Sequence, residues 1–162
     1  MRMESNDKFR CVIQHVGDFS ILTNYKIAFL CSRQMQSSAV LKSYDWAINQ
    51  REKGFCVISG FHSQLEKDVL HYLLKGKQPI IVALARGLKR KIEPELKKPL
   101  DEGRLLIITP FDETVTRVTE ETARKRNEMM IEIADEVVVG YRKEGGQIDK
   151  MINRCKKEIV YL

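Results

Sequence analysis

Short apolar runs alternate with longer amphipathic segments along the chain, and this alternation constrains the fold more than any other feature. Residues 26–32 (KIAFLCS) form an almost continuous apolar run, which is typical of a strand covered on both faces of a sheet. Strands are predicted at residues 10–16, 26–32, 55–59, 79–84, 105–109, 136–140 and 158–162. Helices are predicted at residues 37–54, 64–76, 92–103, about 116–134 and 147–157.

Parallel neighbouring strands need crossover connections, which are usually helices. The pattern therefore predicts an α/β protein with a Rossmann-like three-layer fold, a mostly parallel sheet and helices on both faces. The chain has 162 residues, enough for one domain with a sizeable core, and shows no internal repeat, low-complexity tract or linker. We expect a single domain over residues 1–162, with residues 1–9 flexible.

The cysteines and histidines show no metal-ligand spacing. Cys31 and Cys56 lie in predicted strands, so we expect them to be buried free thiols of a reducing compartment. His15, His62 and His71 share no ligand spacing with one another or with cysteine, and each is interpreted as a surface or satisfied core residue. We therefore expect no metal and no cofactor.

The chain opens on a polar segment (MRMESNDKFR), and no apolar run is long enough to span a bilayer. We therefore expect a cytoplasmic protein with no membrane partner. Lys and Arg total 28 against 22 Asp and Glu, and much of this excess lies in two clusters, RGLKRK (86–91) and RKR (124–126). A net charge of +6 permits an acidic partner such as a nucleic acid or a nucleotide without requiring one.

Small and cationic residues follow the predicted strands. Ligands of parallel α/β sheets bind at the carboxyl ends of the strands, near the point where the strand order reverses. Small residues let backbone amides approach a phosphate, and arginine offers a bidentate fork. The residues at these positions are Ser32, Arg33, Ser59, Gly60, Arg86, Gly87, Pro110 and the loop at residues 141–147. Neither GxGxxG nor GxxxxGK[ST] occurs, so the prediction is a phosphate-binding rim rather than a known loop motif.

Three segments of the chain carry a family resemblance. Residues 16–34 (VGDFSILTNYKIAFLCSRQ) are similar to the pattern kGdlslL…vaIVGSR, with Ser32 and Arg33 at its end and Cys31 in place of glycine. Residues 56–88 (CVISGFHSQLEKDVLHYLLKGKQPIIVALARGL) are similar to vvSGlArGIDaaAHraAL…tIaVlgtGl, with Glu66 at the acidic position. Residues 123–147 (ARKRNEMMIEIADEVVVGYRKEGGQ) are similar to fprRNRiIaglsdavvVvEa…SGSl, with Glu128 in place of the second arginine.

These patterns, in this order, resemble the Rossmann-type core of the DNA-processing protein family, DprA/Smf, within the SLOG superfamily. The resemblance implies a basic pocket for single-stranded DNA, used in DNA uptake or recombination. It also favours a homodimer, as does the apolar run at residues 158–162, which is expected at a sheet edge. The expected nucleotide or DNA phosphate-binding residues are Ser32, Arg33, Ser59, Gly60, Arg86, Gly87, Lys125, Arg126, Asn127, Gly145 and Gly146.

Two other functions stay open at this point. The related lonely guy phosphoribohydrolases cleave nucleoside monophosphates and carry the signature PGGxGTxxE. Here Gly145 and Gly146 match its glycine pair, but the Gly-Thr is absent and Met151 stands at the position of the catalytic glutamate, so a binding protein is favoured over an enzyme. The other possibility is a nucleotide sensor without catalysis. Phe61, Phe111 and Tyr141 are candidates for base stacking or, equally, for packing over the sheet edge.

Glu128 has two interpretations. It lines the pocket and accepts a hydrogen bond from a ribose or a base edge, or it turns outward and pairs with Arg124 four residues earlier.

Overall fold

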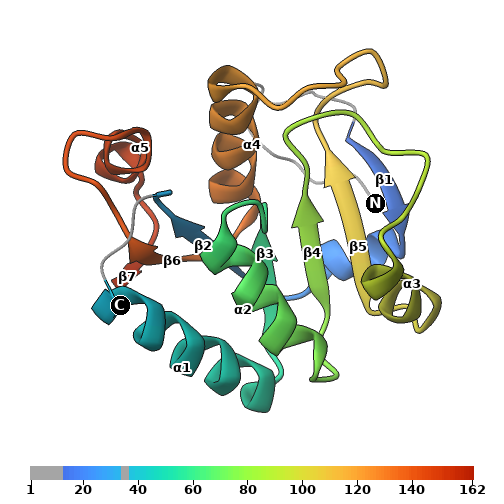
Figure 1. Ribbon diagram of the computed structural model, residues 1–162, viewed down its shortest axis with the longest axis horizontal. Coiled ribbons are helices and arrows are strands. Elements are labelled where there is room, and N and C mark those ends of the chain that lie inside the picture. The colour runs from blue at the N-terminus through green and yellow to red at the C-terminus, as the bar shows by residue number, and fades with distance from the viewer. Residues whose placement is uncertain (1–12, 34–36) are drawn as a thin grey trace.

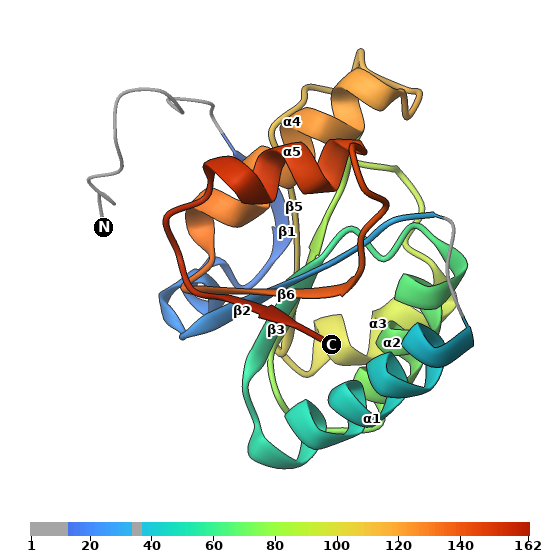
Figure 2. The same ribbon diagram turned by 90° about the vertical axis from the view of Figure 1, so that its left-hand side faces the viewer.

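The computed structural model describes residues 13–33 and 37–162, which form a seven-stranded sheet with helices on both faces (Figures 1 and 2). The strands are β1 (Gln14–Gly17), β2 (Lys26–Cys31), β3 (Cys56–Ser59), β4 (Ile80–Ala83), β5 (Leu105–Thr109), β6 (Glu136–Tyr141) and β7 (Ile159–Tyr161). The helices are α1 (Ser37–Lys53), α2 (Gln64–Leu74), α3 (Pro94–Asp101), α4 (Glu120–Ile133) and α5 (Gln147–Arg154), and a short 3₁₀ helix, η2, spans Phe19–Thr23.

The strand order is β1-β5-β4-β3-β2-β6-β7, and every pair is parallel except β1 with β5. The predicted α/β fold with a mostly parallel sheet is therefore confirmed. The run at residues 158–162 supplies β7 at one edge, as expected. The single antiparallel pair was not predicted: β1 returns along β5 at the other edge, with Gln14 opposite Thr109 and Gly17 opposite Leu106.

Two apolar clusters fill the space between the sheet and its helices. Helices α1, α2 and α3 cover one face, where Leu65, Val69 and Leu73 of α2 are fully buried. Helices α4 and α5, with η2, cover the other face, where Met130 of α4 is fully buried. Figure 2 shows this separation, with α4 and α5 above the sheet and the other three helices below it. The buried strand residues belong to both clusters alternately, because successive side chains point to opposite faces.

Two predicted helix boundaries were wrong by three or four residues, and the others differ by two residues or fewer. Helix α4 begins at Glu120 rather than near residue 116, because Thr119 forms a capping box with Thr122 and fixes the start there. Helix α5 ends at Arg154 rather than at residue 157. The chain leaves the helix at Cys155, whose backbone is extended, and Lys157 then reaches the end of α4. Cys31 and Cys56 are buried free thiols, as predicted, and burial raises the pKa of each to about 12.

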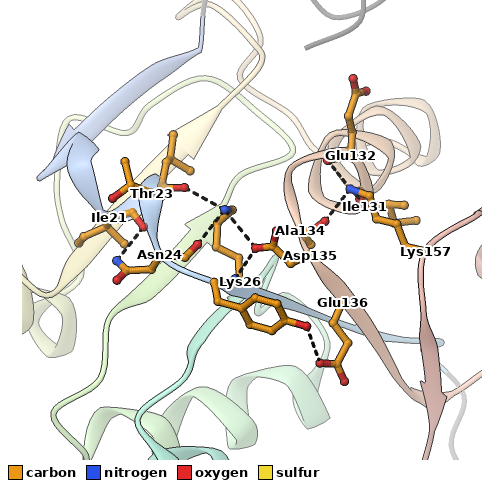
Figure 3. Close-up of polar contacts among 12 residues, drawn as sticks. Ile21, Thr23, Asn24, Lys26, Ile131, Glu132, Ala134, Asp135, Glu136 and Lys157 are labelled. Carbon is orange, nitrogen blue, oxygen red and sulfur yellow. Dashed lines mark hydrogen bonds and ion pairs between the residues drawn. The ribbon is translucent and has the colours of Figure 1, made fainter. Parts of the chain in front are cut away.

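Two lysines donate hydrogen bonds to backbone carbonyls near the amino ends of β2 and β6 (Figure 3). Lys26 is buried; its Nζ donates to the carbonyls of Leu22 at 2.8 Å and Asn24 at 2.9 Å, and lies 3.4 Å from a carboxylate oxygen of Asp135. The Nζ of Lys157 donates to three carbonyls in the last turn of α4, those of Ile131, Glu132 and Ala134. A cation at this position satisfies carbonyls that lack helical partners and opposes the negative end of the helix dipole.

We predict that Lys157→Met lowers the free energy of unfolding by about 1–3 kcal/mol, because three partly buried carbonyls lose their donor. The matched control is Lys156→Met, which removes the same charge from an exposed neighbour and should change stability by less than about 0.5 kcal/mol. Urea denaturation followed by circular dichroism measures both, and equal effects of the two substitutions would contradict the capping role.

Candidate anion-binding site

The strand order reverses between β2 and β6, and the loops after these two strands meet at their carboxyl ends. The chain leaves β2 for α1 on one face, whereas β6 is preceded and followed by α4 and α5 on the other face. Beyond the last paired residues, Ser32 N–H donates to the carbonyl of Tyr141 at 2.8 Å, and Ser32 Oγ accepts from Lys143 N–H at 3.0 Å. Ser32 therefore ties the two loops together at the point where this class of sheet binds ligands.

Arg126 of α4 places its guanidinium beside the carboxyl ends of β3 and β4. Helix α4 begins at this end of the sheet (Figure 1). Because helical side chains point toward the N-terminus of their helix, a residue in the second turn of α4 can reach the strand ends. Arg126 is only 6% exposed. Its Nε donates to Asn127 Oδ1 at 2.9 Å, and its Nη1 makes a long contact of 3.4 Å to the carbonyl of Ala83.

The guanidinium packs directly on Gly60, the residue after β3. A β-carbon built at Gly60 would lie 2.2 Å from Nη1 and 2.5 Å from Cζ of Arg126, so the guanidinium would have to move. Glycine at this position therefore lets the guanidinium lie directly on the backbone of the loop. The preceding Ser59 is fully buried, and its Oγ accepts from Phe61 N–H at 3.3 Å, so it shapes the loop around Gly60.

Arg126 has no ionic partner among the described residues. None of the ion pairs in the described part of the chain, with nitrogen and oxygen within 4.0 Å, includes Arg126. Burial lowers the pKa of Arg126, the charge of Glu66 partly opposes this, and the charge of Arg33 adds to it. Glu66 is itself buried and accepts from the N–H groups of His62 at 3.1 Å and Ser63 at 2.9 Å, which completes the capping box of α2. A buried cation without a paired carboxylate is costly, unless an anion joins it.

Arg33 and His62 also lie at this end of the sheet. Arg33 lies in the loop after β2 and is exposed. His62 comes two residues after Gly60, which contacts the Arg126 guanidinium, and the charges of Arg126 and Arg33 both lower the pKa of its imidazole. Sequence analysis gave His62 no role here. The signal that would have found it is the Ser63–Glu66 capping-box spacing, which predicts that α2 starts directly after His62.

Several residues of the predicted rim lie elsewhere or have other partners. Lys125 is exposed and lies 3.5 Å from Glu121. Arg124 pairs with Glu128 at 2.8 Å, which is the outward-facing interpretation of Glu128. Asn127 is buried and orients Arg126 through its Oδ1.

The loop after β4 packs against the segment before α4. Arg86 Nε donates at 3.4 Å to the carbonyl of its neighbour Gly87. Gly87 N–H donates to Val115 at 2.8 Å, and a β-carbon at Gly87 would meet the Asp112 carbonyl oxygen at 2.2 Å. This loop is therefore joined to the segment before α4, and among the described residues no hydrogen bond links Arg86 or Gly87 to Arg126.

The glycine pair after β6 also has internal partners. Gly145 N–H donates to Asp149 Oδ2 at 3.0 Å, and Gly146 N–H donates to the carbonyl of Lys143 at 3.0 Å. Asp149 in turn pairs with Arg142 at 2.7 Å. Both amides are therefore occupied, although the loop stays beside Ser32. A positive φ of 73° at Gly145 explains why glycine is found there.

Of the three aromatic residues considered for base stacking, Phe61 is not available. Phe61 has a φ of 46°, unusual for a residue with a β-carbon, and its side chain is buried in the cluster shared with α1, α2 and α3. It cannot stack on a base. Phe111 and Tyr141 are half-buried.

A cleft of about 440 Å³ lies at the opposite, amino end of β4 and β5. Its lining includes Lys75, Lys98 and Arg104, but also Glu95 and Glu102. Arg104 is engaged by Glu102 and by the carbonyls of Leu74 and Gln78. The C-terminal ends of α2 and α3 lie here, and their dipoles disfavour an anion. This cleft is therefore a poor anion site, and the cationic region around Arg126 is the better candidate.

Comparison with known proteins identifies related chains. The family model described as DNA recombination-mediator protein A matches residues 2–153. The fold is similar to that of DNA processing protein A from Helicobacter pylori, with a TM-score of 0.74 and 16% identity, over 98% of this chain and 78% of that one. The protein of the same name from Streptococcus pneumoniae gives a TM-score of 0.73 and 16% identity, over 92% of this chain and 54% of that one.

A more distant similarity links the fold to the molybdenum cofactor carrier protein from Chlamydomonas reinhardtii, with a TM-score of 0.55 and 10% identity, over 85% of this chain and 75% of that one. No curated protein sequence shows significant similarity. In the described part of the chain, no helix combines the length and apolar character that a membrane span requires.

We predict that Arg126→Met raises the free energy of unfolding of the ligand-free protein by about 1–2 kcal/mol, because it removes a buried charge that lacks a carboxylate partner. The control is Lys125→Met, which removes an exposed cation from the adjacent position and should change stability by less than about 0.5 kcal/mol. Urea denaturation in a buffer free of phosphate and sulfate is the measurement. A clear loss of stability in Arg126→Met would show that Arg126 is compensated within the fold.

Proposed function

Because the chain belongs to the DNA recombination-mediator protein A family, we propose that it binds single-stranded DNA in DNA uptake or recombination, with a backbone phosphate held by Arg126. The observation that carries this proposal is the buried guanidinium without an ionic partner among the described residues. A phosphodiester supplies the missing negative charge. It also accepts the N–H groups of Nη1 and Nη2 that the Asn127 and Ala83 contacts leave unused.

The surroundings of Arg126 suit a chain of phosphates better than an isolated anion. Arg33 is exposed on the adjoining loop and extends the positive region outward from the buried guanidinium. Gly60 lets the guanidinium of Arg126 lie directly on the loop after β3. A buried contact that fixes one phosphate, with exposed cations along the strand, is typical of sequence-independent binding to single-stranded nucleic acid.

The relatives are consistent with this proposal. The structure of the Helicobacter pylori protein is described as showing a single-stranded DNA binding mode. The chain spans about half the length of the Streptococcus pneumoniae protein, so activities that belong to the rest of such proteins are not part of the proposal.

Hydrolysis of nucleoside monophosphates is less well supported. The catalytic glutamate of the lonely guy signature corresponds to Met151, which is half-buried on α5. The acidic residue that lies closest to it along α5, Asp149, is occupied by Arg142 and Gly145 N–H. A homodimer and a cytoplasmic location stay predictions; β7, with its half-exposed Tyr161, is the edge at which a second copy would pair.

We predict that Arg126→Met weakens binding of a single-stranded oligonucleotide by about tenfold to a hundredfold, as expected for the loss of charge-assisted hydrogen bonds. Gly60→Ala should weaken binding similarly, because the new β-carbon displaces the guanidinium. Lys125→Met has the same charge change as Arg126→Met and should cost less than about threefold. Fluorescence anisotropy measures all three.

The salt dependence of the same assay distinguishes DNA from a small nucleotide as the ligand. For a single strand, the logarithm of affinity falls with the logarithm of salt concentration by about 0.7 for each phosphate contacted. We expect a slope steeper than that of AMP binding. A protein that binds AMP tightly, and oligonucleotides weakly or not at all, would be a nucleotide sensor and would contradict the proposal.

We also predict that the protein releases no free base from AMP or the other nucleoside monophosphates, because no carboxylate holds the required position. Chromatographic detection of adenine after prolonged incubation with micromolar protein tests this. Turnover that is retained in Arg126→Met, but lost in Asp149→Asn or Glu144→Gln, would identify an enzyme with a site in the loop after β6.

A further inference from the structure

His62 is held at the edge of the candidate site by its backbone. It follows Phe61, whose positive φ turns the chain sharply, and precedes Ser63, the N-cap of α2. Its N–H donates to the buried carboxylate of Glu66 at 3.1 Å. Its side chain is exposed, so the imidazole is both fixed at its base and open to a ligand. Two residues earlier in the chain, Gly60 contacts the guanidinium of Arg126.

The charged groups that face His62 come from three elements. They are Arg126 of α4, Arg33 of the loop after β2, and Glu66 and Lys67 of α2. Three of the four are cations, and the one carboxylate is engaged by two backbone N–H groups. Partial burial, Arg126 and Arg33 lower the pKa of His62, with a further small effect of Lys67, and Glu66 opposes them only in part. Together these effects favour the neutral imidazole in the ligand-free protein.

We propose that His62 is a further phosphate contact, which takes up a proton when single-stranded DNA binds beside Arg126. This inference rests on the proposed function and names an additional residue of the same site. A phosphodiester compensates the charges of Arg126 and Arg33, which are the groups that disfavour a second positive charge on the imidazole. It also accepts a hydrogen bond from a ring nitrogen, and the imidazolium has two such donors where the neutral ring has one.

This contact is a property of this chain rather than of the family pattern. At the position of His62, the pattern vvSGlArGID has alanine, which neither titrates nor donates a hydrogen bond. The neighbouring Ser59 and Gly60 match the pattern, so the substitution adds a titratable group to an otherwise similar loop.

The direction of the pH dependence follows from proton uptake. If the complex binds more protons at His62 than the free protein, affinity rises as pH falls through the interval between the two pKa values. A phosphodiester keeps its charge over this interval. A difference of one pKa unit between the bound and free states corresponds to a tenfold change in affinity. We expect affinity to be about threefold to tenfold higher at pH 6 than at pH 8.

The test uses a single-stranded oligonucleotide with hydroxyl groups at both ends, because a terminal phosphate monoester itself titrates near pH 6. Affinity is measured from pH 5.5 to pH 8.5 at constant ionic strength for the natural protein, His62→Gln and His62→Ala. The control is His71→Gln, which removes another exposed histidine, this one in the last turn of α2. Calorimetry in two buffers with different ionisation enthalpies gives the number of protons taken up.

We expect the natural protein and His71→Gln to bind more tightly at low pH and to take up a substantial fraction of one proton near pH 7. Both His62 variants should lose this uptake, and their affinities should change little between pH 6 and pH 8. Equal pH dependence and proton uptake in all four proteins would overturn the role of His62 alone. Absence of oligonucleotide binding by the natural protein at every pH would overturn the proposed function and this inference with it.

Discussion

The packing of the Arg126 guanidinium on Gly60 is the contact on which the candidate site depends. A β-carbon after β3 would displace the guanidinium, and a firmly held helix is needed to bring this charged side chain into a largely buried position. Helix α4 is held at both ends. Thr119 caps its start, and Lys157 donates hydrogen bonds to carbonyls of its last turn. The side chain of Gln147 on α5 also donates to the carbonyl of Glu120 at 3.2 Å. A charge that costs free energy to bury is thus kept in place by interactions elsewhere.

The partners of the individual lysine and arginine side chains indicate more about function than the net charge of the chain does. Lys26 and Lys157 bind backbone carbonyls at the amino ends of the strands, and Arg124 and Lys125 pair with glutamates of their own helix. Lys26 and Lys157 therefore stabilise the fold, and Arg124 and Lys125 form ion pairs along their own helix. Arg126 differs from its two neighbours because it is buried and no described carboxylate pairs with it. The arginine cluster at residues 124–126 therefore contributes one principal side chain to the site rather than three.

The parallel strands and the helices between them could be predicted because continuous apolar runs and helical periodicity are local signals. The antiparallel β1 could not, because its partner β5 lies about ninety residues away and nothing in either segment fixes the direction of pairing. Arg126 could have been separated from Lys125 by helical spacing, since Met129 and Met130, three and four residues later, mark the buried face. The occupied amides of Gly87, Gly145 and Gly146 could not be foreseen, because their acceptors are fixed only by loop packing.

The central claim is that the guanidinium of Arg126 receives an anionic phosphate of single-stranded DNA. Nitrogen-15 NMR of arginine side chains tests it most directly, with the Arg126 signal assigned by its loss in Arg126→Lys. Titration with a hydroxyl-ended oligonucleotide should shift the Arg126 Nε–H resonance and saturate at the same concentration as binding measured by anisotropy. The Arg124 resonance should move little, because its partner is Glu128. An Arg126 resonance that stays unchanged while the oligonucleotide binds would contradict the account.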